Sequence, residues 1–166
     1  MWIYHYTVGD KVRQIQTEGF LRPSTAGVPY DEEPITWFSS HTFFEPTARK
    51  MIIREDGTSE ILSVREMHEM CNGVYRYGLS DTDEASMIEF GISGWDVIKV
   101  QARISKEQRR RLAISGRSQG ARTSQWYGTI KDVVPIDRLR CEKLHFIGTH
   151  GFRWHEHFFL KSERIG

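Results

Sequence analysis

The chain has 166 residues, the length of a single domain, and the composition of an ordinary folded globular protein. Its 23 Lys and Arg residues nearly balance its 22 Asp and Glu residues, so the formal net charge of +1 gives no whole-molecule attraction to nucleic acid or membranes. Two cysteines, Cys71 and Cys141, are too few for a disulfide framework and favour a reducing cytoplasm. No apolar run approaches the roughly 18 residues of a membrane span, and the N-terminus lacks the pattern of a signal peptide.

The first half of the chain predicts short strands and helices around one long loop. Aromatic and β-branched residues at 2–7 predict a strand, and residues 8–18 predict a helix that Gly19 ends. Prolines and glycines over 21–34 predict a loop, whose length makes it a candidate ligand loop. The other predicted elements are a strand at 35–39, a helix at 45–53, a turn at Asp56–Gly57, a helix at 63–70 with a capping box of Ser63 and Glu66, and a strand at 73–79.

The second half is richer in predicted strands. Residues 80–84 predict an acidic turn, and residues 97–104 fit a strand or a helix equally well. A helix at 106–114 ends near Gly116, and a polar segment at 115–124 has the composition of a mobile surface loop. Strands are predicted at 126–134, 144–147 and 152–160. The predicted fold class is therefore α+β, with small helices on mostly antiparallel strands.

The first predicted strand carries residues that suit a nucleotide. Because side chains alternate along a strand, His5 and Thr7 share one face, and Tyr4 and Tyr6 share the other. An imidazole beside a hydroxyl can hydrogen-bond a ribose diol, and a tyrosine ring can stack on a planar base. The commoner alternative is a core histidine that is bonded to a backbone carbonyl.

The second predicted strand ends in Trp37, Phe38, Ser39 and Ser40, and Glu45 follows at a predicted helix start. By composition alone this segment is unremarkable. Either serine could cap the next segment, and Glu45 could simply complement a helix dipole.

Together these segments resemble the ADP-ribosyltransferase-like superfamily. The resemblance rests on HYT in the first strand, EGFLRPS at residues 18–24 and WFSS at residues 37–40, and it covers roughly the first 50 residues. The spacing is most similar to small bacterial and phage proteins and to the DNA-modifying and RNA 2′-phosphotransferase branches. The resemblance implies two small, mostly antiparallel sheets around a cleft that binds NAD as co-substrate.

The resemblance also implies roles for individual residues. On the ribose side it places His5 and Thr7, and on the nicotinamide side Tyr6, Trp37, Phe38, Ser39 and Ser40.

The strand after the predicted mobile loop departs from the family pattern. Many transferases of this family carry Gln-x-Glu or Glu-x-Glu there, whereas this chain has Gln125, Trp126 and Tyr127, so Tyr127 stands where the catalytic glutamate would be. An oriented carboxylate stabilises an oxocarbenium-like transition state, and a neutral tyrosine does not. Three alternatives remain: Glu45 or Glu142 supplies the carboxylate, with Glu45 favoured, or the pocket binds without transfer, or basic residues run the chemistry.

A basic cluster lies beside the predicted mobile loop. It has six positive charges against one negative charge, and its cations are Lys106, Arg109, Arg110, Arg111, Arg117 and Arg122. Such a cluster suits nucleic-acid phosphates, and Trp126 is close enough in sequence to stack on an exposed base. A solvated helix face is an equally good interpretation.

The predicted function is NAD-dependent transfer of ADP-ribose to a macromolecular acceptor. Nucleic acid, either RNA or single-stranded DNA, is favoured over protein as the acceptor. The resemblance implies a toxin, defence or phage counter-defence setting, in which a cognate antitoxin or inhibitor would be a further partner. The alternative is a catalytically degenerate protein of the same fold that sequesters a nucleotide, RNA or a partner protein.

A third and weaker hypothesis is a zinc-dependent hydrolase or nuclease built on the C-terminal histidines, which are His145, His150, His155 and His157. Their spacing matches no standard zinc motif, so solvated or hydrogen-bonded histidines are the default. Cys71 and Cys141 are more readily interpreted as buried apolar residues than as nucleophiles.

Overall fold

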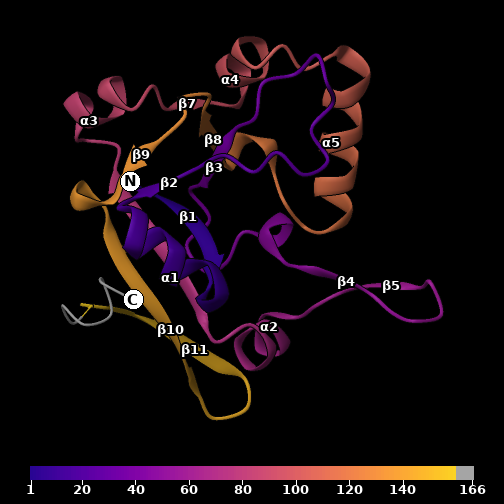
Figure 1. Cartoon of the computed structure of the whole chain (residues 1–166), viewed down its shortest axis with the longest axis vertical. Helices are drawn as coiled ribbons and strands as arrows, with labels where there is room; N and C mark the ends of the chain where they lie inside the picture. The colour runs from indigo at the N-terminus through magenta and orange to yellow at the C-terminus, as the bar shows by residue number, and fades with distance from the viewer. Residues whose placement is uncertain (160–166) are drawn as a thin grey trace.

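The computed structural model describes residues 1–159 and shows an α+β fold around one seven-stranded sheet (Figure 1). Every strand pairing in this part of the chain is antiparallel. In sheet order the strands are β11 (Gly151–Glu156), β10 (Arg140–Ile147), β6 (Val74–Ser80), β1 (Trp2–Val8), β3 (Thr36–Ser39), β8 (Trp126–Thr129) and β7 (Ser93–Gly94). Two further pairs are β2 (Phe20–Leu21) with β9 (Val134–Pro135) and β4 (Met51–Ile53) with β5 (Ser59–Ile61).

The large sheet is nearly divided between β1 and β3. β1 pairs with β6 along its whole length, but it pairs with β3 at one position, Tyr4 opposite Ser39. Next to this pair, Nδ1 of His5 lies 2.8 Å from the carbonyl oxygen of Trp37. The expectation of two small sheets is therefore wrong, because a single register pair joins both halves into one sheet.

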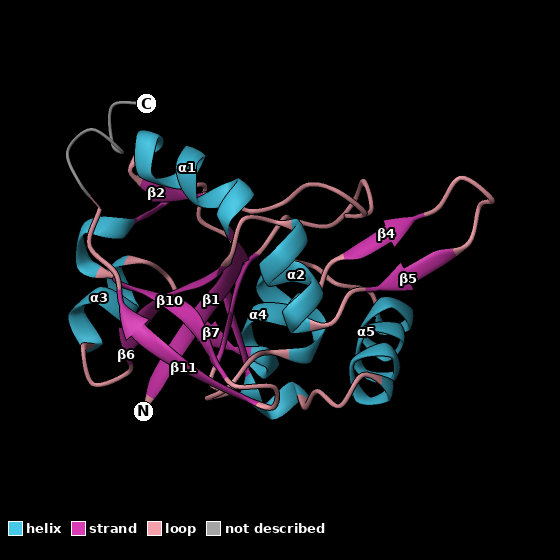
Figure 2. Cartoon of the chain, turned by 90° about the horizontal axis from the view of Figure 1, so that it is seen from below, coloured by secondary structure: helices cyan, strands magenta, loops and turns pink. Residues whose placement is uncertain are grey.

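Five helices and three 3-10 turns surround the sheet in residues 1–159 (Figure 2). The helices are α1 (Gly9–Glu18), α2 (Val64–Met70), α3 (Glu84–Glu89), α4 (Trp95–Gln101) and α5 (Lys106–Ser118), and the turns are η1 (Pro46–Ala48), η2 (Thr123–Gln125) and η3 (Ile136–Arg138). No helix in this part of the chain combines the length and apolar character that crossing a membrane requires.

The alternation of β6 explains how the sheet buries both faces. Tyr77 and Leu79 point to a core that includes Val12 of α1, whereas Val74 belongs to a second core with Met67 of α2. A third apolar cluster, centred on Ile98, packs α4 near the β3–β8 end of the sheet.

Several local predictions are confirmed. The first helix ends at Gly19, which adopts the left-handed conformation with φ of 85° that favours glycine. Ser63 and Glu66 form the predicted capping box, in which each side chain binds the other's backbone N–H. The ambiguous segment at 97–104 is helical as far as Gln101.

The helix predicted at 45–53 is wrong. Only Pro46–Ala48 forms a 3-10 turn, and Met51–Ile53 is a strand that pairs with Ser59–Ile61 across the predicted turn at Asp56–Gly57. Asp56 accepts hydrogen bonds from the backbone and hydroxyl of Thr58, which fixes this hairpin. Hairpin pairing of a β-branched segment therefore prevails over the helix start signal at Pro46.

The predicted surface loop at 115–124 is also only partly correct. α5 continues through Ser118, so Gly116 lies inside the helix, and residues 123–125 form a 3-10 turn. The strand predicted at 126–134 divides into β8 and β9, whose partners lie in different sheets. The last predicted strand ends at Glu156, and its proposed final residue, Leu160, lies outside the described residues.

Candidate active site

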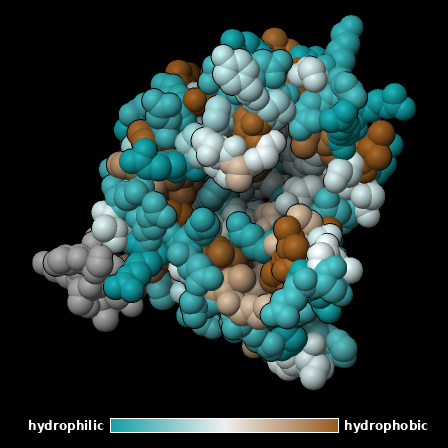
Figure 3. Space-filling model, turned by 45° about the vertical axis from the view of Figure 1, so that its right-hand side comes forward, coloured by the Kyte–Doolittle hydropathy of each residue, from teal (hydrophilic) through white to brown (hydrophobic). Residues whose placement is uncertain are grey.

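A cavity of about 490 Å³ opens where β1 and β3 separate. Its walls come from β1, β3 and β8, from α5, and from the segment that contains η1, while the predicted ligand loop contributes Ser24. The face that carries α5 and the β4–β5 hairpin is visibly hollowed (Figure 3). The volume is within the range of small-molecule and cofactor sites.

His5 presents one free ring nitrogen to this cavity. Because a carbonyl oxygen can only accept, Nδ1 carries the proton that is donated to Trp37. Within residues 1–159, Nε2 has no hydrogen-bond partner, and burial together with the charge of Lys50 lowers the pKa of the imidazole. His5 is therefore neutral, and its Nε2 can accept a hydrogen bond from a ligand hydroxyl. Its bond to the Trp37 carbonyl is also the bond expected of a core histidine, which was the commoner alternative.

We expect the titration of His5 to couple folding to pH. Its lowered pKa means that the unfolded chain binds a proton first, so the contribution to stability is present above about pH 6.5 and is lost as the pH falls. His5→Asn keeps a donor for Trp37 and removes the titration. Urea unfolding between about pH 5 and 7 should show wild type losing stability relative to the variant, and parallel curves would contradict this expectation.

Glu45 is the buried carboxylate of the cavity, with 5% of its surface exposed. Its Oε2 accepts a hydrogen bond from the Ser39 hydroxyl at 2.7 Å. Its Oε1 accepts from the Thr47 hydroxyl at 2.7 Å and from the indole N–H of Trp126 at 3.1 Å. It also accepts from the Thr47 backbone at 3.4 Å, so Glu45 caps η1 as well as facing the cavity. These donors hold the carboxylate in one orientation.

Gly116 allows Trp126 to reach Glu45. A Cβ built on Gly116 would lie 2.7 Å from the Trp126 ring, closer than carbon atoms pack. The indole is buried and bonded to Glu45, so it cannot easily move away. Close packing against Trp126 therefore explains why a glycine stands at this position of α5.

We therefore expect Gly116→Ala to destabilise the protein, although the same substitution usually stabilises a helix interior. Alanine ordinarily stabilises a helix interior by about 0.5–1 kcal/mol relative to glycine, but overpacking against Trp126 should cost about 1–3 kcal/mol. Thermal unfolding measures the net change, and indole fluorescence reports the displacement of Trp126. Ser118→Ala, at an exposed position of the same helix, is the control. A more stable Gly116→Ala protein would refute the proposed packing.

Arg49 and Lys50 give the cavity a basic side. Arg49 uses Nε to donate to the carbonyl of Pro46, and its two terminal nitrogens have no hydrogen-bond partner among the described residues. Neither cation has an ion-pair partner within residues 1–159. Two such cations beside the cavity suit the phosphates of a nucleotide.

Aromatic rings make up another part of the wall. Trp37 is 36% exposed, and its ring centroid lies 6.1 Å from that of Trp126 and 6.1 Å from that of Trp95. Trp95 and Trp126 pack edge to face at 5.3 Å. The exposed part of Trp37 offers a fixed flat surface to a ring of the ligand.

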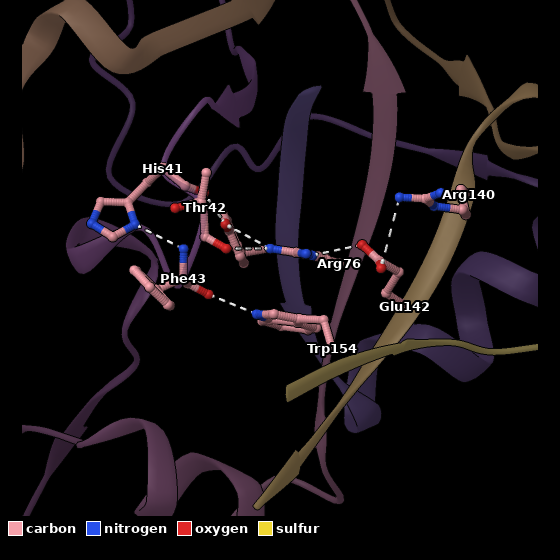
Figure 4. Close-up of polar contacts among 8 residues, drawn as sticks. His41, Thr42, Phe43, Arg76, Arg140, Glu142 and Trp154 are labelled. Carbon is pink, nitrogen blue, oxygen red and sulfur yellow. Dashed lines mark hydrogen bonds and ion pairs between the residues drawn. The ribbon is translucent and has the colours of Figure 1, made fainter. Parts of the chain in front are cut away.

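A buried cationic side chain anchors the loop that leads to Glu45 (Figure 4). Arg76 is 6% exposed, forms an ion pair with Glu142 at 2.9 Å and donates to the carbonyl of Thr42 at 2.8 Å. Its guanidinium lies 3.7 Å from the ring centroid of Tyr4 and 4.3 Å from that of Trp154. The Arg76 side chain thus connects β6 and β10 to the loop.

Two more contacts fix the same loop. Trp154 donates from its indole N–H to the carbonyl of Phe43 at 2.8 Å, and Tyr6 donates to the carbonyl of His41. Burial raises the pKa of the Tyr6 hydroxyl, so it remains a neutral donor. Residues 41–43 are therefore held on both sides immediately before Glu45.

The structure brings together a large part of the predicted site. His5, Tyr6, Trp37, Phe38, Ser39, Glu45 and Trp126 all line the cavity. Tyr4 does so as well, although alternation places it on the opposite face from His5. The reason is that the cavity opens along the edge of β1 where the sheet divides. Side chains on both faces of the strand can reach the cavity from that edge.

Other predicted residues lie elsewhere. Thr7 is buried outside the cavity, and Ser40 does not line it. Tyr127 packs against the core on the other face of β8, so it does not take the place of a catalytic group. Glu142 is paired with Arg76 and lies 3.8 Å from Arg140, so the cavity contains Glu45 and not Glu142.

Trp126 does not fit the predicted role of stacking on an exposed base. It is buried, and its N–H is bonded to Glu45, so it is a wall of the cavity. None of the arginines of the basic cluster, Arg109, Arg110, Arg111, Arg117 and Arg122, lines the cavity either.

The C-terminal histidines do not assemble a metal site. His145 and His155 pack edge to face at 5.0 Å, but residues 1–159 contain no group of three or more His, Cys, Asp or Glu side chains that could hold a metal ion. Burial raises the pKa of the Cys141 thiol to about 12, which opposes a role as a nucleophile.

Sequence reasoning missed the basic pair, the wall from α5 and the Arg76 anchor. Arg49 and Lys50 carried a signal, because two cations directly follow Thr47 and Ala48. Gly116 and Gln119 gave none, because their contribution depends on how α5 packs against β8. Arg76 sits in an alternating strand pattern that indicated only a strand.

Comparisons of this chain with protein-family models, curated proteins and solved structures find no match. The site is therefore characterised by its own geometry: a cavity with a fixed buried carboxylate, a neutral histidine acceptor, an aromatic wall and a basic side.

Proposed function

We propose that the protein transfers ADP-ribose from NAD to a macromolecular acceptor. The observation that carries the proposal is Glu45, a carboxylate held by Ser39, Thr47 and Trp126 in a cavity that also contains His5. The resemblance of the HYT and WFSS segments to ADP-ribosyltransferases supports the same assignment.

The residues of the cavity fit NAD as a substrate. The exposed face of Trp37 suits the nicotinamide ring, and Nε2 of His5 suits a ribose hydroxyl. Arg49 and Lys50 suit the pyrophosphate. A cavity of about 490 Å³ accommodates a large part of such a ligand.

The proposed chemistry breaks the bond between the ribose anomeric carbon and the nicotinamide nitrogen. The electron pair of this bond leaves with nicotinamide, which becomes neutral, and positive charge develops on the ribose. The Glu45 carboxylate stabilises this oxocarbenium-like charge, and a nucleophile on the acceptor then bonds to the anomeric carbon and loses its proton. Since the carboxylate is oriented before the reaction, little reorganisation is needed in the transition state.

The direct test is incubation of the protein with NAD carrying a label in its adenylate part, together with RNA, single-stranded DNA or protein acceptors. The proposal predicts nicotinamide release and transfer of label to one acceptor class. Neither release nor transfer, under conditions where a known transferase is active, would reject it.

One observation favours the second candidate, a binding protein without turnover. Both oxygens of Glu45 already accept hydrogen bonds from protein groups. Calorimetry with product analysis separates the candidates, because a binder recovers NAD unchanged whereas a transferase releases nicotinamide.

A further inference from the structure

The outer face of α5 carries a row of cations that the cavity does not use. Lys106, Arg110 and Arg117 recur at four- and seven-residue spacing and so share one side of the helix. The cavity is lined instead by Leu112, Gly116 and other residues from a different side of α5. A single helix thus separates the proposed reaction site from a basic surface.

These cations are exposed and unpaired, in contrast to their neighbours. Arg111 pairs with Glu107, and Arg109 donates to the carbonyl of Ile104 at 2.7 Å. Lys106, Arg110, Arg117 and Arg122 are exposed and have no ion pair or side-chain hydrogen bond within residues 1–159. Four cations without internal partners remain available to an external anion.

A second hollow of about 340 Å³ lies at the C-terminal end of this row. Its lining consists of Ala113, Arg117, Ala121, Arg122, Thr123 and Ser124. Two guanidinium groups, two hydroxyls and a floor of small apolar side chains match the chemistry of a phosphodiester and its sugar. The volume exceeds what a carboxylate side chain needs, which favours nucleic acid over an acidic peptide.

The hollow and the first cavity have neighbouring residues in their walls at this end of α5, since Arg117 lines the hollow and Gly116 and Gln119 line the cavity. η2 carries Thr123 of the hollow, and the chain then enters β8 at Trp126, a wall of the cavity. From Lys106 to Arg117 the helix rises about 16 Å, a length that spans several phosphates of one strand. A strand along α5 would therefore arrive at the rim of the cavity. A reacting group must leave base pairing to enter the cavity, which favours a single strand.

We propose that the outer face of α5 and the adjoining hollow bind the sugar–phosphate backbone of single-stranded nucleic acid. Its identification as the acceptor rests on the proposed transferase function. Binding of the strand by itself needs neither NAD nor turnover.

The test is fluorescence anisotropy with short labelled RNA and DNA single strands of mixed sequence, titrated at several salt concentrations. The variant is Arg117→Glu with Arg122→Glu, and the matched control is Lys11→Glu with Arg13→Glu, two exposed cations of α1. Both double variants change the net charge equally. Thermal unfolding confirms that each is folded.

Wild type should bind, with a log–log salt slope of about −3 for four phosphate contacts on a single strand. The α5 variant should bind at least about tenfold more weakly, with a slope smaller in magnitude by about 1.4, whereas the α1 control should match wild type. RNA and DNA arms show whether the 2′-hydroxyl contributes.

Three results would overturn the inference: no binding by wild type at low salt, equal loss in both double variants, or equal competition by polyglutamate, which would indicate an acidic protein partner. Nicotinamide release, measured with the RNA, single-stranded DNA and protein acceptors of the direct test, separates this inference from the proposed function. Strand binding without NAD cleavage would support the α5 surface and reject the transferase. NAD cleavage without strand binding would reject the α5 surface alone.

Discussion

Glu45→Gln should lower the rate of nicotinamide release from NAD by about 100- to 1000-fold, the loss typical when one group that stabilises transition-state charge is removed. The substitution removes the negative charge and changes the side-chain volume very little. Product analysis by chromatography measures the rate, and calorimetry measures whether NAD still binds.

The fold should tolerate this substitution. The amide oxygen can keep the bonds from Thr47 and Trp126, while the amide nitrogen can donate to the Ser39 hydroxyl, which can rotate to accept. Ser39 also accepts from the backbone of His41, and its two lone pairs suffice for both donors. A large loss of turnover with little loss of stability would therefore point to the charge itself.

Glu18→Gln is a suitable control, because Glu18 lies on α1 and its bonds to Gln14 and Arg22 are remote from the cavity. It should leave nicotinamide release unchanged. If Glu45→Gln retained wild-type turnover, the carboxylate would have no part in the reaction and the proposed chemistry would fail.

Arg76→Met should destabilise the protein by about 3–5 kcal/mol, because it leaves the buried carboxylate of Glu142 with only the longer contact to Arg140 at 3.8 Å. It also removes the donor to the carbonyl of Thr42 and the cation between Tyr4 and Trp154. Urea or thermal unfolding gives the magnitude. Arg76→Lys should lose less, since it retains the charge but not the geometry of the guanidinium.

A double variant separates the pair from the surrounding packing. Arg76→Met with Glu142→Leu removes both charges, so it should recover a substantial part of the loss caused by Arg76→Met alone. Equal destabilisation of the single and double variants would show that the cost comes from the loop and the rings and not from the carboxylate that loses Arg76.

Sequence reasoning succeeded where local chemistry decides the structure. Gly19 ends α1 and Ser63 caps α2 because those signals act within a few residues. The segment at 45–53 fails for the opposite reason, since Met51–Ile53 is fixed by a partner strand whose paired residues lie six to ten positions away. The local secondary-structure preference around Pro46 contains no information about that strand pairing.

The site shows the same distinction. Ser39 and Glu45 are six residues apart, and the sequence already indicated Glu45 as the preferred carboxylate. The contact of Glu45 with Trp126 spans 81 positions, and the exclusion of Glu142 depends on Arg76, so neither could be predicted from spacing. The interpretation of Trp126 as a base-stacking residue was wrong because burial is a property of the packed fold.

The division of the sheet affects which groups of the protein can recognise a ligand. Beyond the pair of Tyr4 and Ser39, the facing edges of β1 and β3 are not laddered to each other, and the cavity opens at that gap. Peptide groups at such edges can act as donors and acceptors for a planar amide, in the way that an added strand binds a sheet edge. A side-chain substitution cannot remove a carbonyl, and only a substitution by proline removes an N–H. Ligand specificity that rests on these backbone groups would therefore persist when the side chains around them are substituted.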